Sequence, residues 1–180
     1  RGSLRDPNTV NLSAIFAIRL LKDPAGHVLA AANVNAYTPA RLHMQLERFD
    51  SPVYVEQIKR AAMLTRCPFS AQPYRDHDDH LRWLDETVDI GLQLSLTESF
   101  NYVALEHLAL GIPCVTSRAV EFSPWRVDAE DYQGAAAVIL DQIIPNYASA
   151  SEAAIHAAKE VAARNEALFV DTFQTLLHKE

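Results

Sequence analysis

The stretch Val88–Ser117, VDIGLQLSLTESFNYVALEHLALGIPCVTS, carries the clearest sign of how this chain folds. Residues 88–95 form a short apolar run of the length and composition of a strand buried on both faces. Residues 101–110 have the apolar spacing of a helix, which a Gly-Ile-Pro sequence then ends. A second apolar run at 112–116 completes a strand, turn, helix and strand, the repeating unit of a parallel sheet.

The rest of the chain alternates in the same way. The pattern predicts further strands at 27–32 and 67–69, and helices over 8–23, 38–49, 53–64, 80–87, 132–144 and 149–178. Asp78 or Asp79 is the expected N-cap of the helix over 80–87, and Ser149 with Glu152 the expected capping box of the last helix. This alternation predicts an α/β fold, a three-layer Rossmann-like parallel sheet with helices on both faces. Because a strand should precede the first helix, we also expect a fragment whose first strand is truncated.

Composition limits the classes of function. The 180 residues are 49% apolar and 22% charged, which is typical of one domain with a sizeable core. The net charge of −7 argues against a nucleic-acid partner. No apolar run approaches the ~20 residues of a membrane span, and no signal segment opens the chain. Cys67 and Cys114 lie far apart in apolar surroundings, so we expect reduced, buried thiols and a cytoplasmic location.

Two acids stand out at the edge of the sheet where ligands are expected. Ligands of open parallel sheets bind beyond the carboxyl ends of the strands, and the turn at 96–100 lies there. The helix that starts near Asn101 offers unpaired N–H groups suited to a diphosphate. Glu98 lies on the turn and Glu106 in the helix, where a carboxylate can accept hydrogen bonds from the vicinal hydroxyls of a ribose. The alternative is that both acids are ordinary helix surface, and their position at the ligand edge argues against it.

The segment ESFNYVALEHLALGIPCVTS, residues 98–117, resembles the E-x7-E segment of GT-B glycosyltransferases of the family-4-like group. Two weaker likenesses extend over the chain. Residues 126–131, RVDAED, resemble a later loop of that family, and residues 2–5, GSLR, resemble the G-x-x-R-x-x-K-N opening of its donor-binding domain. The resemblance implies that residues 1–180 are the C-terminal donor-binding domain of a two-domain GT-B protein whose N-terminal acceptor domain lies outside this chain.

The resemblance implies transfer of a sugar from a UDP- or GDP-sugar to an acceptor with retention of configuration, without metal or other cofactor. The implied catalytic residues are Glu98, at the hydroxyls of the donor sugar, and Arg5, at the diphosphate. Tyr74 is a candidate for stacking on the base, although an ordinary surface loop is an equal alternative. The expected donor-binding residues are Glu106, Ser99, Phe100, Asn101, Tyr102, Tyr74 and Thr116.

One departure from the family pattern leaves other functions open. The family places a lysine three to six residues after its arginine, but Asn8 and Asn11 occupy the positions after Arg5, and Lys22 is expected at the far end of the first helix. This favours a degenerate, non-catalytic module that binds a partner as the alternative function. An epimerase of the same sheet plan, acting on a UDP-sugar, is a third reading.

Other features are assigned to structure. The cluster at 76–80, DHDDH, has metal-capable side chains but is interpreted as a solvated loop and helix start, and His107 as a structural residue. Phe122, Trp125 and Tyr132 are expected in the core or at a domain interface. The apolar stripe of the last helix is a candidate for homo-oligomer contacts, and peripheral membrane association of the full-length protein stays open.

Overall fold

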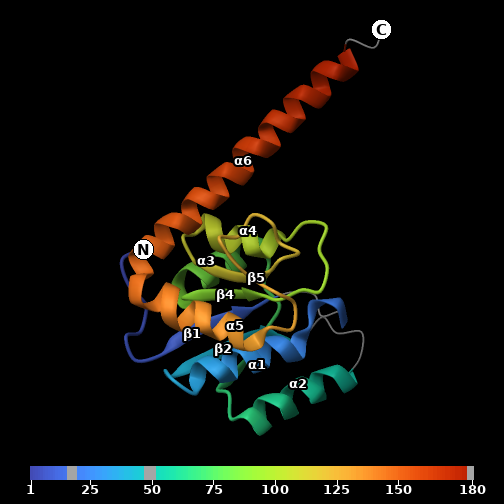
Figure 1. Ribbon diagram of the computed structural model, residues 1–180. Helices are drawn as coiled ribbons and strands as arrows, with labels where there is room; N and C mark the ends of the chain where they lie inside the picture. Colours follow the sequence, from blue (N-terminus) through green and yellow to red (C-terminus); the bar gives the residue numbers. More distant parts are fainter. Residues whose placement is uncertain (16–19, 47–51, 178–180) are drawn as a thin grey trace.

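The computed structural model describes residues 1–15, 20–46 and 52–177, which form an α/β domain around one parallel sheet (Figure 1). The six strands lie in the order β3-β2-β1-β4-β5-β6, and all neighbours are parallel. They are β1 (Val10–Ala14), β2 (Ala40–Gln45), β3 (Phe69–Gln72), β4 (Ile90–Gln93), β5 (Cys114–Ser117) and β6 (Trp125–Val127). The strand order reverses its direction between β1 and β4, which is where ligands bind in such sheets.

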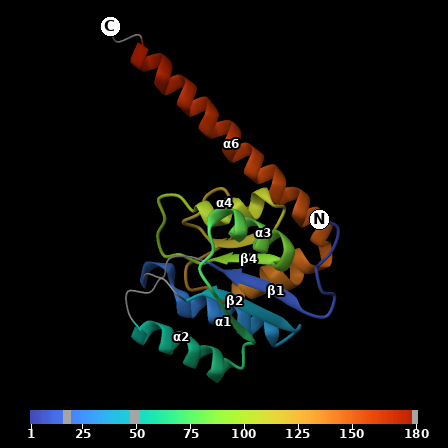
Figure 2. The same cartoon turned by 180° about the vertical axis from the view of Figure 1, so that it is seen from behind.

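Helices cover both faces of the sheet. They are α1 (Pro24–Asn35), α2 (Pro52–Thr65), α3 (His77–Thr87), α4 (Tyr102–Ala109), α5 (Tyr132–Ala137) and α6 (Tyr147–Leu177). Short turns of helix span Leu20–Lys22, Val138–Ile143 and Ile144–Asn146. Figures 1 and 2 show α3 and α4 over one face and α1 and α5 over the other, with α2 packed against α1. The three-layer Rossmann-like fold is therefore confirmed.

The long helix α6 begins beside the N terminus, packs along α4 and then extends beyond the body of the domain (Figures 1 and 2). No helix within the described ranges is long and apolar enough to cross a membrane.

The first part of the chain differs from expectation. The helix expected over 8–23 contains β1, the strand expected at 27–32 lies within α1, and the helix expected over 38–49 contains β2. Val10, Leu12 and Ala14 alternate with polar residues along β1, which pairs with β2 and β4 and so becomes a central strand. A short apolar run fits the period of a helix as well as the alternation of a strand. Pairing with strands far away in the sequence decided that residues 10–14 form a strand. β1 precedes the first α-helix, α1, in the order of elements.

Later elements agree with the sequence except at their ends and in one strand. α3 is capped by Asp76, whose carboxylate accepts from the Asp79 N–H at 2.9 Å, so the expected caps at Asp78 and Asp79 are wrong. α6 already begins at Tyr147, and this places Ser149 inside its first turn rather than at a capping box. β6 was not expected, and it brings Trp125 to the edge of the sheet.

Helix α4 lies close to the sheet because β4 has a glycine beneath it. A Cβ on Gly91 would come 2.6 Å from Cδ2 of His107 and 2.8 Å from Sγ of Cys114. On the opposite face, Leu12, Leu42 and Leu92 are fully buried in the core. This packing sets where the N-terminus of α4 meets the carboxyl edge of the sheet.

Candidate functional site

The loops that follow β1 and β4 meet at the carboxyl edge of the sheet. The Leu96 N–H donates to the Leu21 carbonyl at 2.8 Å, and the Leu94 N–H donates to Nε2 of His27 at 2.9 Å. These bonds join α1 and the segment before it to the residues between β4 and α4. As a result, the carboxylate of Glu98 and the ammonium group of Lys22 lie next to each other.

Glu98 is held by three donors. Its Oε1 accepts from Nζ of Lys22, from Oγ of Ser95 at 2.9 Å and from Nδ2 of Asn101 at 2.9 Å. The side chain of Glu98 is only 8% exposed and that of Lys22 20%. We expected Lys22 at the far end of a helix, away from the site, and this was wrong because residues 10–14 form strand β1 and Lys22 contacts Glu98 at the carboxyl edge.

Asn101 connects Glu98 to the start of α4. Its Oδ1 caps the helix by accepting from the Ala104 N–H at 2.9 Å, while Nδ2 donates to Glu98 and, at 3.1 Å, to Gln93. An amide side chain that satisfies a helix N-terminus and a carboxylate together orients both groups. The first turn of α4 therefore points its positive end toward the edge where Glu98 and Lys22 lie.

The residues that flank Asn101 lie in the turn before α4 and at the start of this helix. The rings of Phe100 and Tyr102 make an edge-to-face contact with centroids 4.8 Å apart, and Tyr102 is mostly exposed. Ser99 is exposed in the same loop. The structure thus places the five consecutive residues from Glu98 to Tyr102 in the turn and helix start at the carboxyl edge of the sheet.

Glu106 lies in α4 and faces the start of α3. Its Oε1 lies 3.0 Å from Nε2 of His77, and its Oε2 lies 3.6 Å from Nε2 of His80. Burial raises the pKa of Glu106, but hydrogen bonds and the charges of His80 and His77 outweigh burial, so the pKa is lowered overall. The carboxylate is therefore ionised and held between two imidazoles. We interpreted this histidine cluster as a solvated loop, and only the packing of α3 against α4 reveals its partner.

An aromatic and cationic group borders the same edge after β3. The Arg75 guanidinium lies 4.7 Å from the ring centroid of Trp83 and donates to Oε1 of Gln72 at 3.0 Å. Trp83 also stacks on His80, with centroids 6.1 Å apart. Tyr74 follows β3 at this edge and is 51% exposed. The loop after β3 is thus connected through Trp83 and His80 to Glu106.

Thr116 lies deeper than expected. It is fully buried in β5, beside Gln93 of β4, and its Oγ1 makes no hydrogen bond within the described residues. It therefore lies beneath the turn that carries Glu98 rather than on the surface of the site.

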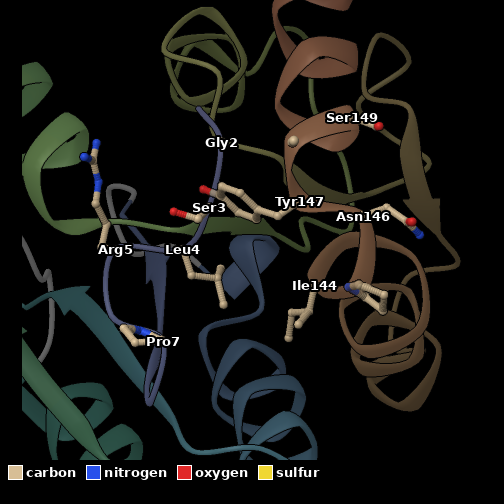
Figure 3. Close-up of a pocket in the computed structure, with 11 residues that line it drawn as sticks. Gly2, Ser3, Leu4, Arg5, Pro7, Ile144, Asn146, Tyr147 and Ser149 are labelled. Carbon is tan, nitrogen blue, oxygen red and sulfur yellow. The ribbon is translucent and has the colours of Figure 1, made fainter.

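The structure does not bring Arg5 to these residues. The Arg5 N–H donates to Oδ1 of Asp89 at 2.7 Å, and its guanidinium lies 3.4 Å from Asp85 of α3. Asp89 directly precedes β4, so Arg5 is at the amino edge of the sheet, opposite Glu98. The reason is topological, since a segment that precedes a strand lies at its amino end. Arg5 and Leu4 both line a pocket of about 790 Å³ at this edge, and Figure 3 shows their side chains pointing in different directions.

His107 is structural, as expected. Its Nδ1 donates to the Val103 carbonyl at 2.6 Å and its Nε2 accepts from Oγ of Ser13 at 2.5 Å. Burial lowers its pKa to about 4. Cys67 and Cys114 are buried free thiols.

Comparison with known proteins gives structural matches alone. No protein-family profile matches the chain, and no curated protein matches its sequence. The structure of Anabaena Alr3699/HepE in complex with UDP and glucose matches with a TM-score of 0.74 and 17% identity, over 93% of this chain and 49% of HepE. A UDP-forming α,α-trehalose-phosphate synthase from Burkholderia xenovorans matches with a TM-score of 0.72 and 15% identity, over 96% of this chain and 45% of the synthase.

A third match is the catalytic domain of cholesterol-α-glucosyltransferase from Helicobacter pylori, with a TM-score of 0.71, 15% identity, and coverage of 86% of this chain and 98% of that domain. At these identities the likeness shows the fold, and the expected GT-B fold is confirmed. The chain spans less than half of HepE and of the synthase.

Proposed function

We propose that this chain binds a nucleoside-diphosphate sugar at the carboxyl edge of its sheet, as the donor-binding domain of a glycosyltransferase. The observation that carries the proposal is the meeting of Lys22, Glu98 and Asn101 at the N-terminus of α4, with Glu106 further along the same helix. The names of the matching structures, which mention UDP, glucose and sugar transfer, support this ligand class.

Each group has a role that its chemistry suits. The Lys22 ammonium and the first turn of α4, with the N–H groups of Phe100, Asn101 and Tyr102, offset the charge of the diphosphate. The ionised Glu106 accepts from the ribose hydroxyls, and Glu98 from hydroxyls of the donor sugar. Tyr74 borders the base.

Lys22 also changes the assignment of the family motif. Arg19 precedes Lys22 by three residues and Asp23 follows it, so the spacing R-x-x-K occurs here rather than at Arg5. Arg19 lies outside the described residues. The ion pair of Lys22 with Glu98 supports a donor-binding site over the alternative of a degenerate module.

In the full protein, a second domain would supply the acceptor, and transfer would proceed with retention and without metal or other cofactor. Positive charge from Lys22 and the helix N-terminus would stabilise the leaving diphosphate in place of a metal ion.

Isothermal titration calorimetry with UDP, GDP, UDP-glucose and uridine tests the proposal. Glu106→Gln keeps the shape of the side chain but loses its charge. It should weaken the binding of UDP and of uridine alike by roughly 10- to 150-fold, which corresponds to the loss of a charged hydrogen bond of about 1.5–3 kcal/mol. Lys22→Met should weaken UDP but not uridine. Glu152→Gln, at an exposed position on α6, is the matched control. Absence of binding to every nucleoside diphosphate by the unchanged chain, or full affinity in Glu106→Gln, would overturn the proposal.

A further inference from the structure

Asp23, which directly follows Lys22, has a backbone conformation that needs support. Its φ of 43° and ψ of 61° lie in the left-handed region, which is strained for a residue with a side chain. Three contacts hold it there. Oδ1 accepts from the Gly26 N–H at 3.1 Å, the carbonyl accepts from Nδ1 of His27 at 2.8 Å, and Oδ2 accepts from the Tyr132 hydroxyl at 2.8 Å. We refer to Asp23, His27 and Tyr132 as the clasp.

His27 joins the two loops of the candidate site. The Leu94 N–H can only donate, so Nε2 of His27 accepts and Nδ1 carries the proton that is donated to Asp23. The imidazole is fully buried, and burial lowers its pKa to about 4, so it is neutral at physiological pH. One side chain therefore ties the segment that carries Lys22 to the end of the strand that leads to Glu98.

Tyr132 anchors the same turn from α5, a third segment of the chain. Burial and the hydrogen bond to Asp23 raise its pKa, so the hydroxyl stays a proton donor. Its ring lies against the first turn of α1, because a Cβ on Gly26 would come 2.3 Å from Cε1 of Tyr132 and 2.0 Å from Oδ2 of Asp23. Glycine is required for this close approach.

We infer that the clasp positions Lys22 against Glu98 and so presets the ammonium group for a diphosphate. The inference rests on the proposed function for its ligand, while the positioning itself is a property of the ligand-free chain. A lysine has a long flexible stem, and fixing the backbone directly after it reduces the freedom lost when phosphate binds. Asp23, His27 and Tyr132 act through Lys22 and are positioning residues rather than groups that touch the ligand.

The first arm of the test measures Lys22 in the absence of any ligand. The chain has four lysines, and Lys59 on α2 is exposed, so it serves as an internal reference for acetylation by N-hydroxysuccinimide acetate followed by mass spectrometry. Tyr132→Phe and Asp23→Ala should raise the relative acetylation of Lys22 by roughly threefold to tenfold. Asp23→Asn, which keeps a capping oxygen and tolerates the left-handed conformation, should restore protection. Tyr37→Phe, at a tyrosine that is 83% exposed, is the matched control.

The second arm measures binding by calorimetry. Tyr132→Phe should weaken the binding of UDP by roughly threefold to tenfold and leave the binding of uridine unchanged, because uridine lacks the diphosphate that Lys22 contacts. A purely structural defect would instead weaken the binding of both. Unchanged Lys22 acetylation in Tyr132→Phe and Asp23→Ala, with both variants folded by circular dichroism, overturns the clasp even if the chain binds UDP. The expected acetylation pattern in a chain that binds no nucleotide supports the clasp and overturns the proposed function.

Discussion

Lowering the pH from 7.5 to 5.0 should destabilise the domain, because three histidines are buried in their neutral form. Burial is the first cause that lowers the pKa of His27, His43 and His107 to about 4 in each case. Both ring nitrogens are engaged in every case. For His43, Nε2 lies 3.1 Å from Oδ1 of Asn11, and Nδ1 lies 3.1 Å from Nε2 of Gln72.

The sign and size follow from proton linkage. The ordinary histidine pKa of 6.5 applies to the unfolded chain, so between pH 6.5 and about 4 the unfolded chain binds protons that the folded chain does not. Stability is therefore lost as the pH falls through this window, and the loss levels off below about pH 4. At pH 5.0 each histidine should cost about 2 kcal/mol relative to pH 7.5. The three together should cost about 6 kcal/mol, which is comparable with the whole stability of a domain.

Urea unfolding followed by far-UV circular dichroism at the two pH values measures this loss. His43→Gln and His107→Gln each remove one titrating group, so each should make the loss of unfolding free energy between pH 7.5 and 5.0 smaller by about 2 kcal/mol. His156→Gln, at a side chain that is 74% exposed on α6, should leave the loss unchanged. A wild-type domain whose stability changes by less than about 1 kcal/mol between the two pH values, or a His107→Gln variant with the wild-type pH dependence, would refute the reasoning.

Three further outcomes follow from the packing. Gly26→Ala should cost about 1–3 kcal/mol in urea unfolding, since the new Cβ collides with Asp23, and wild-type stability in this variant would contradict that contact. Burial raises the pKa of Cys67 to about 11 and that of Cys114 still further, so Ellman's reagent at pH 7.5 should react with neither thiol until the chain unfolds, and rapid reaction of the folded protein would count against this burial. Asn101→Ala should lower the free energy of unfolding by about 1 kcal/mol through loss of the α4 cap, and it should weaken UDP binding as well. Unchanged UDP affinity would show that Asn101 does not contribute to the binding site.

The sequence by itself determined the elements whose signals are local. The turn and helix at 96–110 could be read because Asn101 caps the helix through its own neighbours and a Gly-Ile-Pro sequence ends it. The positions of the candidate acids Glu98 and Glu106 could be predicted for the same reason, because both lie within that one unit. The fold class also followed, since alternation of strands and helices leaves few arrangements of layers.

Tertiary structure decided the elements whose signals are ambiguous. The apolar run at 10–14 fits a helix or a strand. It is a strand because it pairs with β2 on one side and with β4 on the other. The assignments of 24–35 as a helix and of 40–45 as a strand also differ from those that the sequence predicted.

The contacts within the candidate site were also decided by the tertiary structure. Lys22 meets Glu98 across 76 residues of sequence, and His77 meets Glu106 across 29. Arg5 lies at the opposite edge because it precedes a strand rather than following one. Periodicity and capping report on interactions within a few residues, whereas these pairs depend on strand order and on the packing of α3 against α4, which no local pattern encodes.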